Sequence, residues 1–259
     1  MQVIIGSFIA LEIGYLATRC RLTFARTTSP KIWRDMQENT QPILVDDPRV
    51  LAVPIRECGE PLVDLCEYPL LATKSHPKAR SEAETRLYCR EGVAQRLLGA
   101  EARLPEGIRL LIVECHRPLK LQDAYWEDQL ESLRERHPDW PEEKLATENA
   151  KFVAPSEIVP PHSTGGAVDL VLVDSEGEEL DMGSALNEKG PLMRTDARGL
   201  RQEARHNRKL LLEAMQSTGF VNYPHEWWHF SYGDRYWAYA KDEPAAIYGA
   251  ATRDLTARG

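Results

Sequence analysis

Two short stretches of the chain combine side chains that bind metal ions and transfer protons. The first contains His162 and Asp169, separated by the adjacent Gly165 and Gly166. The glycines let the backbone reverse sharply, which could bring an imidazole and a carboxylate from separate points of the chain to one metal ion. Asp169 also interrupts an apolar run, where a buried carboxylate is costly unless it is paired or bound to metal. Hydrogen bonding within a turn is the alternative role for both residues.

The second stretch, residues 225–229, reads His-Glu-Trp-Trp-His and matches the H-E-x-x-H pattern of the zinc proteases called zincins. A zincin needs both histidines one turn apart on a stable helix. Pro224 lies directly before the stretch, and the aromatic residues within it favour strands. We therefore favour a Glu-x-Trp-His pattern, in which His229 binds metal, Glu226 acts as a base and His225 takes no part.

Together these stretches predict a catalytic zinc site. His162, Asp169 and His229 supply three ligands and leave a fourth position for water, as in catalytic rather than structural zinc sites. Two neutral imidazoles and one carboxylate leave the Zn²⁺ site positively charged, which can lower the pKa of bound water toward about 7. Glu226 would accept the proton of that water and pass it to the leaving amine.

A third feature lies at the end of an apolar run, where Glu-Cys-His-Arg-Pro occupies residues 114–118. The proline biases Arg117 toward an extended backbone, so its side chain is aimed rather than free on a helix surface. A guanidinium at this point could hold a substrate carbonyl as it becomes an oxyanion. A surface or structural arginine is the alternative.

The elements that must position these residues follow from hydrophobic spacing and from glycine and proline. Residues 108–115 and 167–173 are typical of buried strands, and we also expect strands within 220–232. Helices are expected at 119–136, 141–152 and 199–218, with a further helix from Ser81 to near Gly99. Residues 41–80 are rich in proline and predict mostly loop. Because the helices and strands lack regular βαβ spacing, an α+β fold is favoured.

The chain has 259 residues, of which 42% are hydrophobic and 28% charged, enough for one large domain or two small ones. We expect a catalytic domain at 41–245, between an N-terminal extension at 1–40 and a C-terminal tail at 246–259. The net charge of −8 argues against a nucleic acid partner, because proteins that grip phosphate backbones are usually basic. The five cysteines are spread out and form no C-x-x-C pair, so reduced thiols in a cytoplasmic protein are expected, with the periplasm as the alternative location.

The N-terminal region carries no signal for a membrane span. Residues 3–11 form an apolar run of nine, well short of the roughly 20 that a transmembrane helix needs. No lysine or arginine precedes the run, so it lacks the positively charged start of a signal peptide. Arg19 stands where a lipoprotein processing site needs a small residue, which argues against that site as well. Residues 1–35 could also arise from an upstream start codon, with Met36 as the functional initiator.

Three motifs resemble, in the same order, those of the VanX-type zinc D-alanyl-D-alanine dipeptidases. They are His-Arg-Pro at 116–118, His-x-x-Gly-x-Ala-x-Asp at 162–169 and Glu-x-Trp-His at 226–229. The resemblance runs from about residue 50 to 240. It implies a single compact α+β domain, with a central, mainly antiparallel sheet flanked by helices, like the hedgehog and D,D-peptidase folds. It also implies a zinc enzyme that cleaves D-Ala-D-Ala to two D-alanines and disfavours longer peptides.

The resemblance further implies a role for each matching residue. His162, Asp169 and His229 take the positions that bind one zinc ion per chain. Glu226 takes the position of the catalytic base, and Arg117 that of the group that stabilises the transition state. His116, beside this arginine, is a candidate substrate contact.

Two departures from the family pattern bear on the substrate. Pro160 stands where the family usually has serine two positions before the first zinc ligand. Asn187 stands where the family tends to have an aspartate that contacts the substrate ammonium, and Glu188 beside it could replace the missing charge. These departures keep open a zinc D,D-carboxypeptidase or endopeptidase that acts on longer cell-wall peptides. A zinc-stabilised binding module without turnover is a separate alternative, because related folds exist in which the ligands persist and the chemistry is lost. The oligomeric state and the physiological role do not follow from the sequence.

Overall fold

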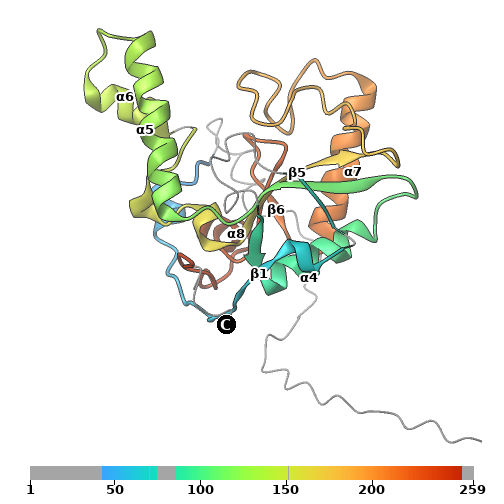
Figure 1. Cartoon of the computed structure of the whole chain (residues 1–259). Helices are drawn as coiled ribbons and strands as arrows, with labels where there is room; N and C mark the ends of the chain where they lie inside the picture. The colour runs from blue at the N-terminus through green and yellow to red at the C-terminus, as the bar shows by residue number, and fades with distance from the viewer. Residues whose placement is uncertain (1–42, 70, 75–85, 151, 253–259) are drawn as a thin grey trace, which may run out of the picture.

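Figure 1 shows a computed structural model of the chain, which describes residues 43–69, 71–74, 86–150 and 152–252. Its central sheet has the strand order β2-β4-β5-β7-β6. These strands are β2 (Ala72–Thr73), β4 (Arg109–Glu114), β5 (Ala167–Val173), β6 (Val221–Asn222) and β7 (His229–Ser231). The β2–β4 pair is parallel and the other pairs are antiparallel. The predicted α+β fold with a mainly antiparallel sheet is thereby confirmed.

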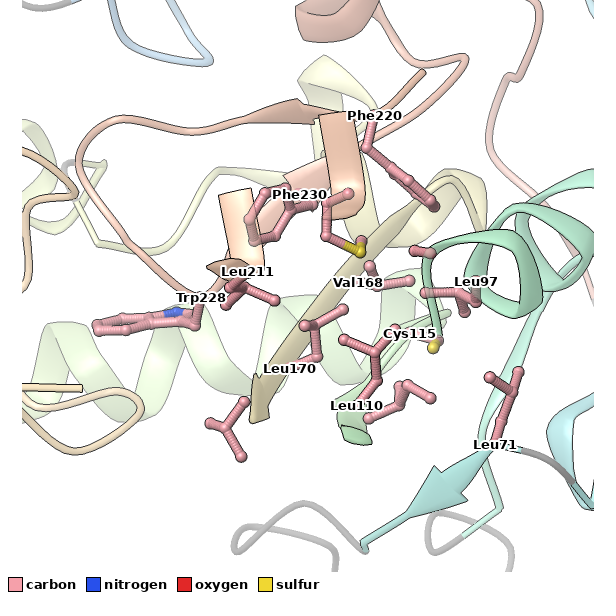
Figure 2. Close-up of a cluster of buried hydrophobic side chains, with 14 of the residues drawn as sticks. Leu71, Leu97, Leu110, Cys115, Val168, Leu170, Leu211, Phe220, Trp228 and Phe230 are labelled. Carbon is pink, nitrogen blue, oxygen red and sulfur yellow. The ribbon is translucent and has the colours of Figure 1, made fainter. Parts of the chain in front are cut away.

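The main hydrophobic core lies between the sheet and two helices, α4 (Glu91–Glu101) and α7 (Gln202–Ser217). Every residue of β5 is buried, because this strand pairs on both sides and packs on both faces. Figure 2 shows Val168 and Leu170 of β5 beside Leu110 of β4, with Leu97 of α4 and Leu211 of α7 around them. The predicted strand at 167–173 therefore forms the centre of the molecule.

Helices α5 (Leu119–Arg136) and α6 (Glu142–Ala150) pack on each other and extend away from the sheet (Figure 1). Helix α5 has the predicted bounds, since Pro118 precedes it and Pro138 follows it closely. The pair has a small core of its own, formed by Leu130, Leu133 and Leu145. In the ranges that the structure describes, no helix is both long and apolar enough to cross a membrane.

The structure corrects one expectation for the first third of the chain. The predicted helix from Ser81 begins at Glu91, because Tyr88–Arg90 forms strand β3, which pairs antiparallel with β1 (Leu62–Asp64). Residues 81–85 lie outside the described part of the chain. The expected loop-rich stretch at 41–80 is confirmed in its described residues, where the regular elements are short: the helix α2 (Pro48–Leu51), β1, a 3-10 turn at Leu65–Glu67 and β2.

Helix α8 (Arg235–Lys241) has no counterpart in the sequence prediction. It begins where the Asp234 carboxylate accepts a hydrogen bond of 2.8 Å from the Trp237 amide, and it packs against the segment from Ile43 to α2. Its seven residues carry too short a periodic pattern to be told from the aromatic strands before it.

Residues 246–252 follow α8 and are bonded to the body of the fold. The Ala246 amide donates to the Pro54 carbonyl at 2.9 Å, and the Ala251 amide donates to the Ser163 carbonyl at 2.8 Å. The predicted domain boundary at 245 therefore falls inside a packed region. The predicted N-terminal extension at 1–40 lies outside the described residues.

Candidate active site

The turn before β5 brings His162 and Asp169 to the same place. His162 lies in a short 3-10 helix, Pro161–Thr164, which ends at Gly165 with a φ of +72°. That left-handed conformation favours glycine. A Cβ atom on Gly166 would lie 2.3 Å from the Tyr232 carbonyl oxygen, so only glycine permits this close backbone approach. The predicted sharp reversal at the two glycines is confirmed.

Strand pairing brings the third side chain to the same site. In the β5–β7 ladder Asp169 lies directly opposite His229, and paired residues of an antiparallel ladder project to the same face. His229 Nδ1 lies 2.9 Å from Asp169 Oδ1 and 3.2 Å from His162 Nε2. The remaining pair, His162 Nε2 and Asp169 Oδ1, is 3.3 Å apart. All three side chains are buried.

This donor set fits a zinc ion. Zinc ligands lie about 2.0–2.2 Å from the metal, so tetrahedral ligand atoms are about 3.3 Å from one another, close to the three separations found here. The His162 Nδ1 atom donates to the Cys115 carbonyl at 2.8 Å, which leaves Nε2 with a lone pair for the metal. Burial disfavours the Asp169 anion, but the two imidazoles more than compensate and hold its pKa below the usual range.

Glu226 lies in the turn that precedes β7. Its amide donates to the Tyr223 carbonyl at 2.9 Å, and its own carbonyl accepts from the His229 amide at 3.2 Å. Burial is the main cause that raises the pKa of its carboxyl group to about 7, and His229 and Arg117 limit the rise while Asp169 adds to it. A carboxylate with this pKa can accept and release a proton near neutral pH.

The zincin alternative is wrong for this chain. Residues 223–228 form turns rather than a helix. His225 is outside the ligand cluster, and its ring lies 5.0 Å from that of Tyr223. Its Nε2 atom is buried without a hydrogen-bond partner in the described structure, and burial with the nearby Arg194 lowers its pKa to about 4.

Arg117 is held rigidly at the end of β4. Its Nε and Nη2 atoms donate to the two carboxylate oxygens of Glu114 at 2.7 and 2.6 Å, and Nη1 donates to Gln122 Oε1 at 2.8 Å. The guanidinium also lies over the Tyr125 ring, 4.7 Å from its centroid. Burial disfavours the charged form, but the Glu114 carboxylate outweighs it and raises the pKa of Arg117.

Those three bonds use three of the five guanidinium N–H groups. Within the described part of the chain, one N–H on Nη1 and one on Nη2 are left for a substrate oxygen. The Arg117 amide also donates to the His162 carbonyl at 3.1 Å, which ties the arginine to the metal-binding turn. Sequence reasoning missed Glu114 and Gln122. Both are buried polar residues. Glu114 lies three positions before Arg117 and Gln122 five positions after it, and this closeness in the sequence is the signal that could have identified them as its partners.

The three predicted substrate contacts lie outside the ligand cluster. His116 Nε2 donates to the Ala251 carbonyl at 3.0 Å, so this ring contacts the C-terminal segment. Asn187 and Glu188 are exposed on one loop, where Asn187 has a φ of +64°. One carboxylate oxygen of Glu188 accepts from the Ala185 amide at 2.9 Å. These assignments stay predictions.

A buried arginine that the sequence analysis did not single out fastens this loop. Arg208 of α7 donates to the carbonyl oxygens of Met182, Arg194 and Leu192 at 2.6, 2.6 and 2.7 Å. Burial lowers its pKa to about 10. The Met193 carbonyl in turn accepts from the Trp227 amide at 3.0 Å, next to Glu226. One cation thus holds the loop against the turn that carries Glu226.

Known proteins resemble the chain over most of these elements. Residues 72–246 match the family model described as D-ala-D-ala dipeptidase. The D-alanyl-D-alanine dipeptidase of Synechocystis sp. is 30% identical over 220 residues, which cover 73% of this chain and 88% of that protein. The protein of the same name from Escherichia coli is 30% identical over 124 residues, 48% of this chain and 55% of that protein.

Among solved structures, the zinc complex of the vancomycin-resistance D,D-pentapeptidase VanY aligns with a TM-score of 0.40 and 12% identity, covering 75% of this chain and 96% of that one. The family match includes the turn at 161–166, the ligand-bearing strands β5 and β7, and the Glu226 turn. The family is zinc-dependent, in keeping with the His/Asp/His cluster. The chain therefore belongs to the zinc-dependent D-alanyl-D-alanine dipeptidase family of peptidases.

Proposed function

We propose that this chain hydrolyses the D-Ala-D-Ala dipeptide to two D-alanines, with His162, Asp169 and His229 as the zinc ligands. The observation that carries the proposal is the convergence of three ligand atoms, one from the 3-10 turn at Pro161–Thr164 and two from strands β5 and β7, all within 4.8 Å of one another. The half-buried side chains of Glu226 and Arg117 act electrostatically on the same cluster. A metal with only a structural role would need neither Glu226 nor Arg117.

The chemistry divides between the metal and the protein. When bound, the zinc ion supplies Lewis acidity, which polarises a carbonyl group and lowers the pKa of water. Glu226, with its pKa raised to about 7, accepts a proton from the attacking water and delivers it to the amine of the departing D-alanine. The partial burial of Glu226 supports this role, because it limits the access of bulk solvent to the proton transfer.

Arg117 would stabilise the negative charge that develops on the scissile carbonyl oxygen. The bonds to Glu114 and Gln122 fix the plane of the guanidinium before substrate binds, so little reorganisation is needed in the transition state. The loop with Asn187 and Glu188 would receive the substrate ammonium. The oxygen of Glu188 that does not accept from the Ala185 amide would contact the ammonium.

The test is the release of free D-alanine from D-Ala-D-Ala by purified, zinc-loaded protein, with L-Ala-L-Ala as the comparison. We expect release from the D,D substrate only. Glu226→Ala should lower turnover by about 10²–10⁴-fold with its zinc content retained. Glu213→Ala is the matched control, because Glu213 is exposed on α7 away from the site. Full activity of the Glu226 variant would overturn the mechanism.

A second candidate is cleavage of longer cell-wall peptides that end in D-Ala-D-Ala. It is favoured by the neutral Asn187 and by the engagement of Glu188 with the Ala185 amide, which together leave the loop with a weaker site for a free ammonium. Faster cleavage of a muropeptide than of the free dipeptide would select this candidate.

A further inference from the structure

The metal ligand His229 has a second ring nitrogen that must also be satisfied. Its Nδ1 atom faces Asp169 and His162, so a neutral, metal-binding ring carries its proton on Nε2. For His162 the corresponding N–H donates to a backbone carbonyl at 2.8 Å. For His229 the partner of Nε2 is a side chain, the hydroxyl of Ser231 at 3.5 Å.

The fold places Ser231 at this point for a simple reason. It follows His229 by two positions on β7, and residues two apart in a strand share a face. Ser231 is fully buried, so its hydroxyl has no access to solvent. That hydroxyl donates in turn to the carboxylate of Asp234, just after the strand.

Asp234 is an unusual residue to find here, because its carboxylate is buried without a lysine or arginine partner among the residues that the structure describes. Only 1% of the residue is exposed. One oxygen accepts from the Trp237 amide at 2.8 Å, and the other, Oδ2, has no hydrogen-bond partner among the described residues. Burial disfavours the charged form of this carboxyl group, and His229 and His162 of the ligand cluster are among the side chains that favour it. A buried carboxylate needs compensating charge, and a cation in the ligand cluster would supply it.

We propose that Ser231 and Asp234 are positioning residues for the metal ligand His229. The chain of donors runs from His229 Nε2–H to the Ser231 hydroxyl and from that hydroxyl to the Asp234 carboxylate. It holds the ring in the tautomer that presents Nδ1 to the metal, and it increases the basicity of that nitrogen. The inference rests on the proposed metal assignment and extends it to two residues outside the ligand set.

The test compares the zinc affinity of variants by competition with a chelating indicator. Ser231→Ala should weaken zinc binding by about 10–100-fold. Ser231→Thr keeps the hydroxyl and should bind zinc nearly as tightly as the natural chain. Ser163→Ala is the matched control, because it removes an equally buried hydroxyl beside His162 that has no hydrogen-bond partner in the described structure. This control should leave zinc affinity unchanged.

The variant Asp234→Asn distinguishes the two roles of this side chain, its negative charge and its hydrogen bond that caps α8. Asparagine caps helices as well as aspartate does, so α8 should persist while the negative charge is lost. We expect the melting temperature of the metal-free protein to stay close to that of the natural chain, while the increase on adding zinc becomes smaller. A purely structural role would instead lower the melting temperature of the metal-free protein.

Equal zinc affinity of Ser231→Ala and the natural chain would overturn the inference and leave the proposed function intact. Failure of the natural chain itself to bind zinc would instead overturn the proposed function. The two failures are therefore distinguishable in the same titration.

Discussion

At the scale of single residues, the geometry of Arg117 predicts that lysine cannot replace it. A guanidinium presents a planar fork that matches the Glu114 carboxylate and leaves N–H groups for substrate, whereas an ammonium is a single point charge. Arg117→Lys should lower kcat by about 10²–10³-fold with little change in zinc content. Steady-state kinetics with D-Ala-D-Ala checks this. The control is Arg109→Lys, because Arg109 is an exposed arginine of β4 that pairs with Glu101. Unchanged kcat in Arg117→Lys would contradict the role.

His225 predicts a pH dependence of stability. Its pKa is about 4 in the folded protein, because burial and the nearby Arg194 disfavour the imidazolium, against 6.5 in the unfolded chain, and Asp196 opposes the shift only in part. Between these values the unfolded chain takes up a proton that the folded protein does not, so the free energy of unfolding falls as pH is lowered from 6.5 to 4.

Replacing this histidine removes the effect. In His225→Asn the free energy of unfolding should decline less steeply between pH 6.5 and 4. The difference in slope between the two proteins should correspond to the uptake of at most one proton on unfolding. Urea unfolding at a series of pH values measures it in both proteins. Comparing variant with natural chain cancels the carboxyl groups that titrate in the same range. Parallel curves would show that His225 is solvated in the folded state.

At the scale of secondary-structure elements, the sequence predicts those parts whose signals are local. Strand β5 and helix α5 have the predicted bounds, because one is a continuous apolar run and the other lies between two prolines. The cluster of His162, Asp169 and His229 was predictable because an aspartate inside an apolar strand needs a partner and two histidines stand in short motifs beside glycines and tryptophans. Helix α4 starts later than predicted, since residues 88–90 are drawn into pairing with β1, a contact that no local pattern shows.

Arg208 and Gln122 could not be predicted for a related reason. Their partners include backbone carbonyl oxygens 14 to 32 residues away in the sequence. Every residue type has a backbone carbonyl, so the sequence does not mark which residues will accept these hydrogen bonds. In the sequence both residues resemble solvated positions on helices. Their burial becomes understandable only once the loop at 182–195 and the segment at Ala154 are in place.

The loop at 182–195 yields a prediction at this scale. Arg208→Met removes the three donors and leaves the carbonyls of Met182, Leu192 and Arg194 unpaired, so the loop should loosen from the turn that carries Glu226. We expect KM for D-Ala-D-Ala to rise about tenfold, equivalent to ~1.4 kcal/mol, with zinc content retained. Arg201→Met is the control, because the side chain of Arg201 is 87% exposed. A KM equal to that of the natural chain would separate Arg208 from substrate recognition.

At the scale of the whole molecule, the segment at 246–252 joins parts of the chain that lie far apart in the sequence. Its backbone bonds to Pro54, Cys58, Gly233 and Ser163, and the Ala251 carbonyl accepts from His116. The two loops that carry Arg117 and His162 are therefore braced by the same short stretch. The integrity of the site thus depends on residues that follow the last ligand by about 20 positions.

Tyr248 is the anchor of this segment and provides the test. Its ring is buried against Gly233, where a Cβ atom would lie 2.4 Å from the ring, and its hydroxyl donates to Glu60. Tyr248→Ala should lower the free energy of unfolding by about 3–5 kcal/mol, as for other buried aromatic residues. Tyr248→Phe removes only the hydroxyl and should cost about 1–3 kcal/mol, because Glu60 loses a buried donor. Urea unfolding gives both values.

If the segment braces the metal site, zinc affinity should fall in the alanine variant and persist in the phenylalanine variant, whereas equal zinc affinity in both would show that the ligand cluster is held by the sheet alone.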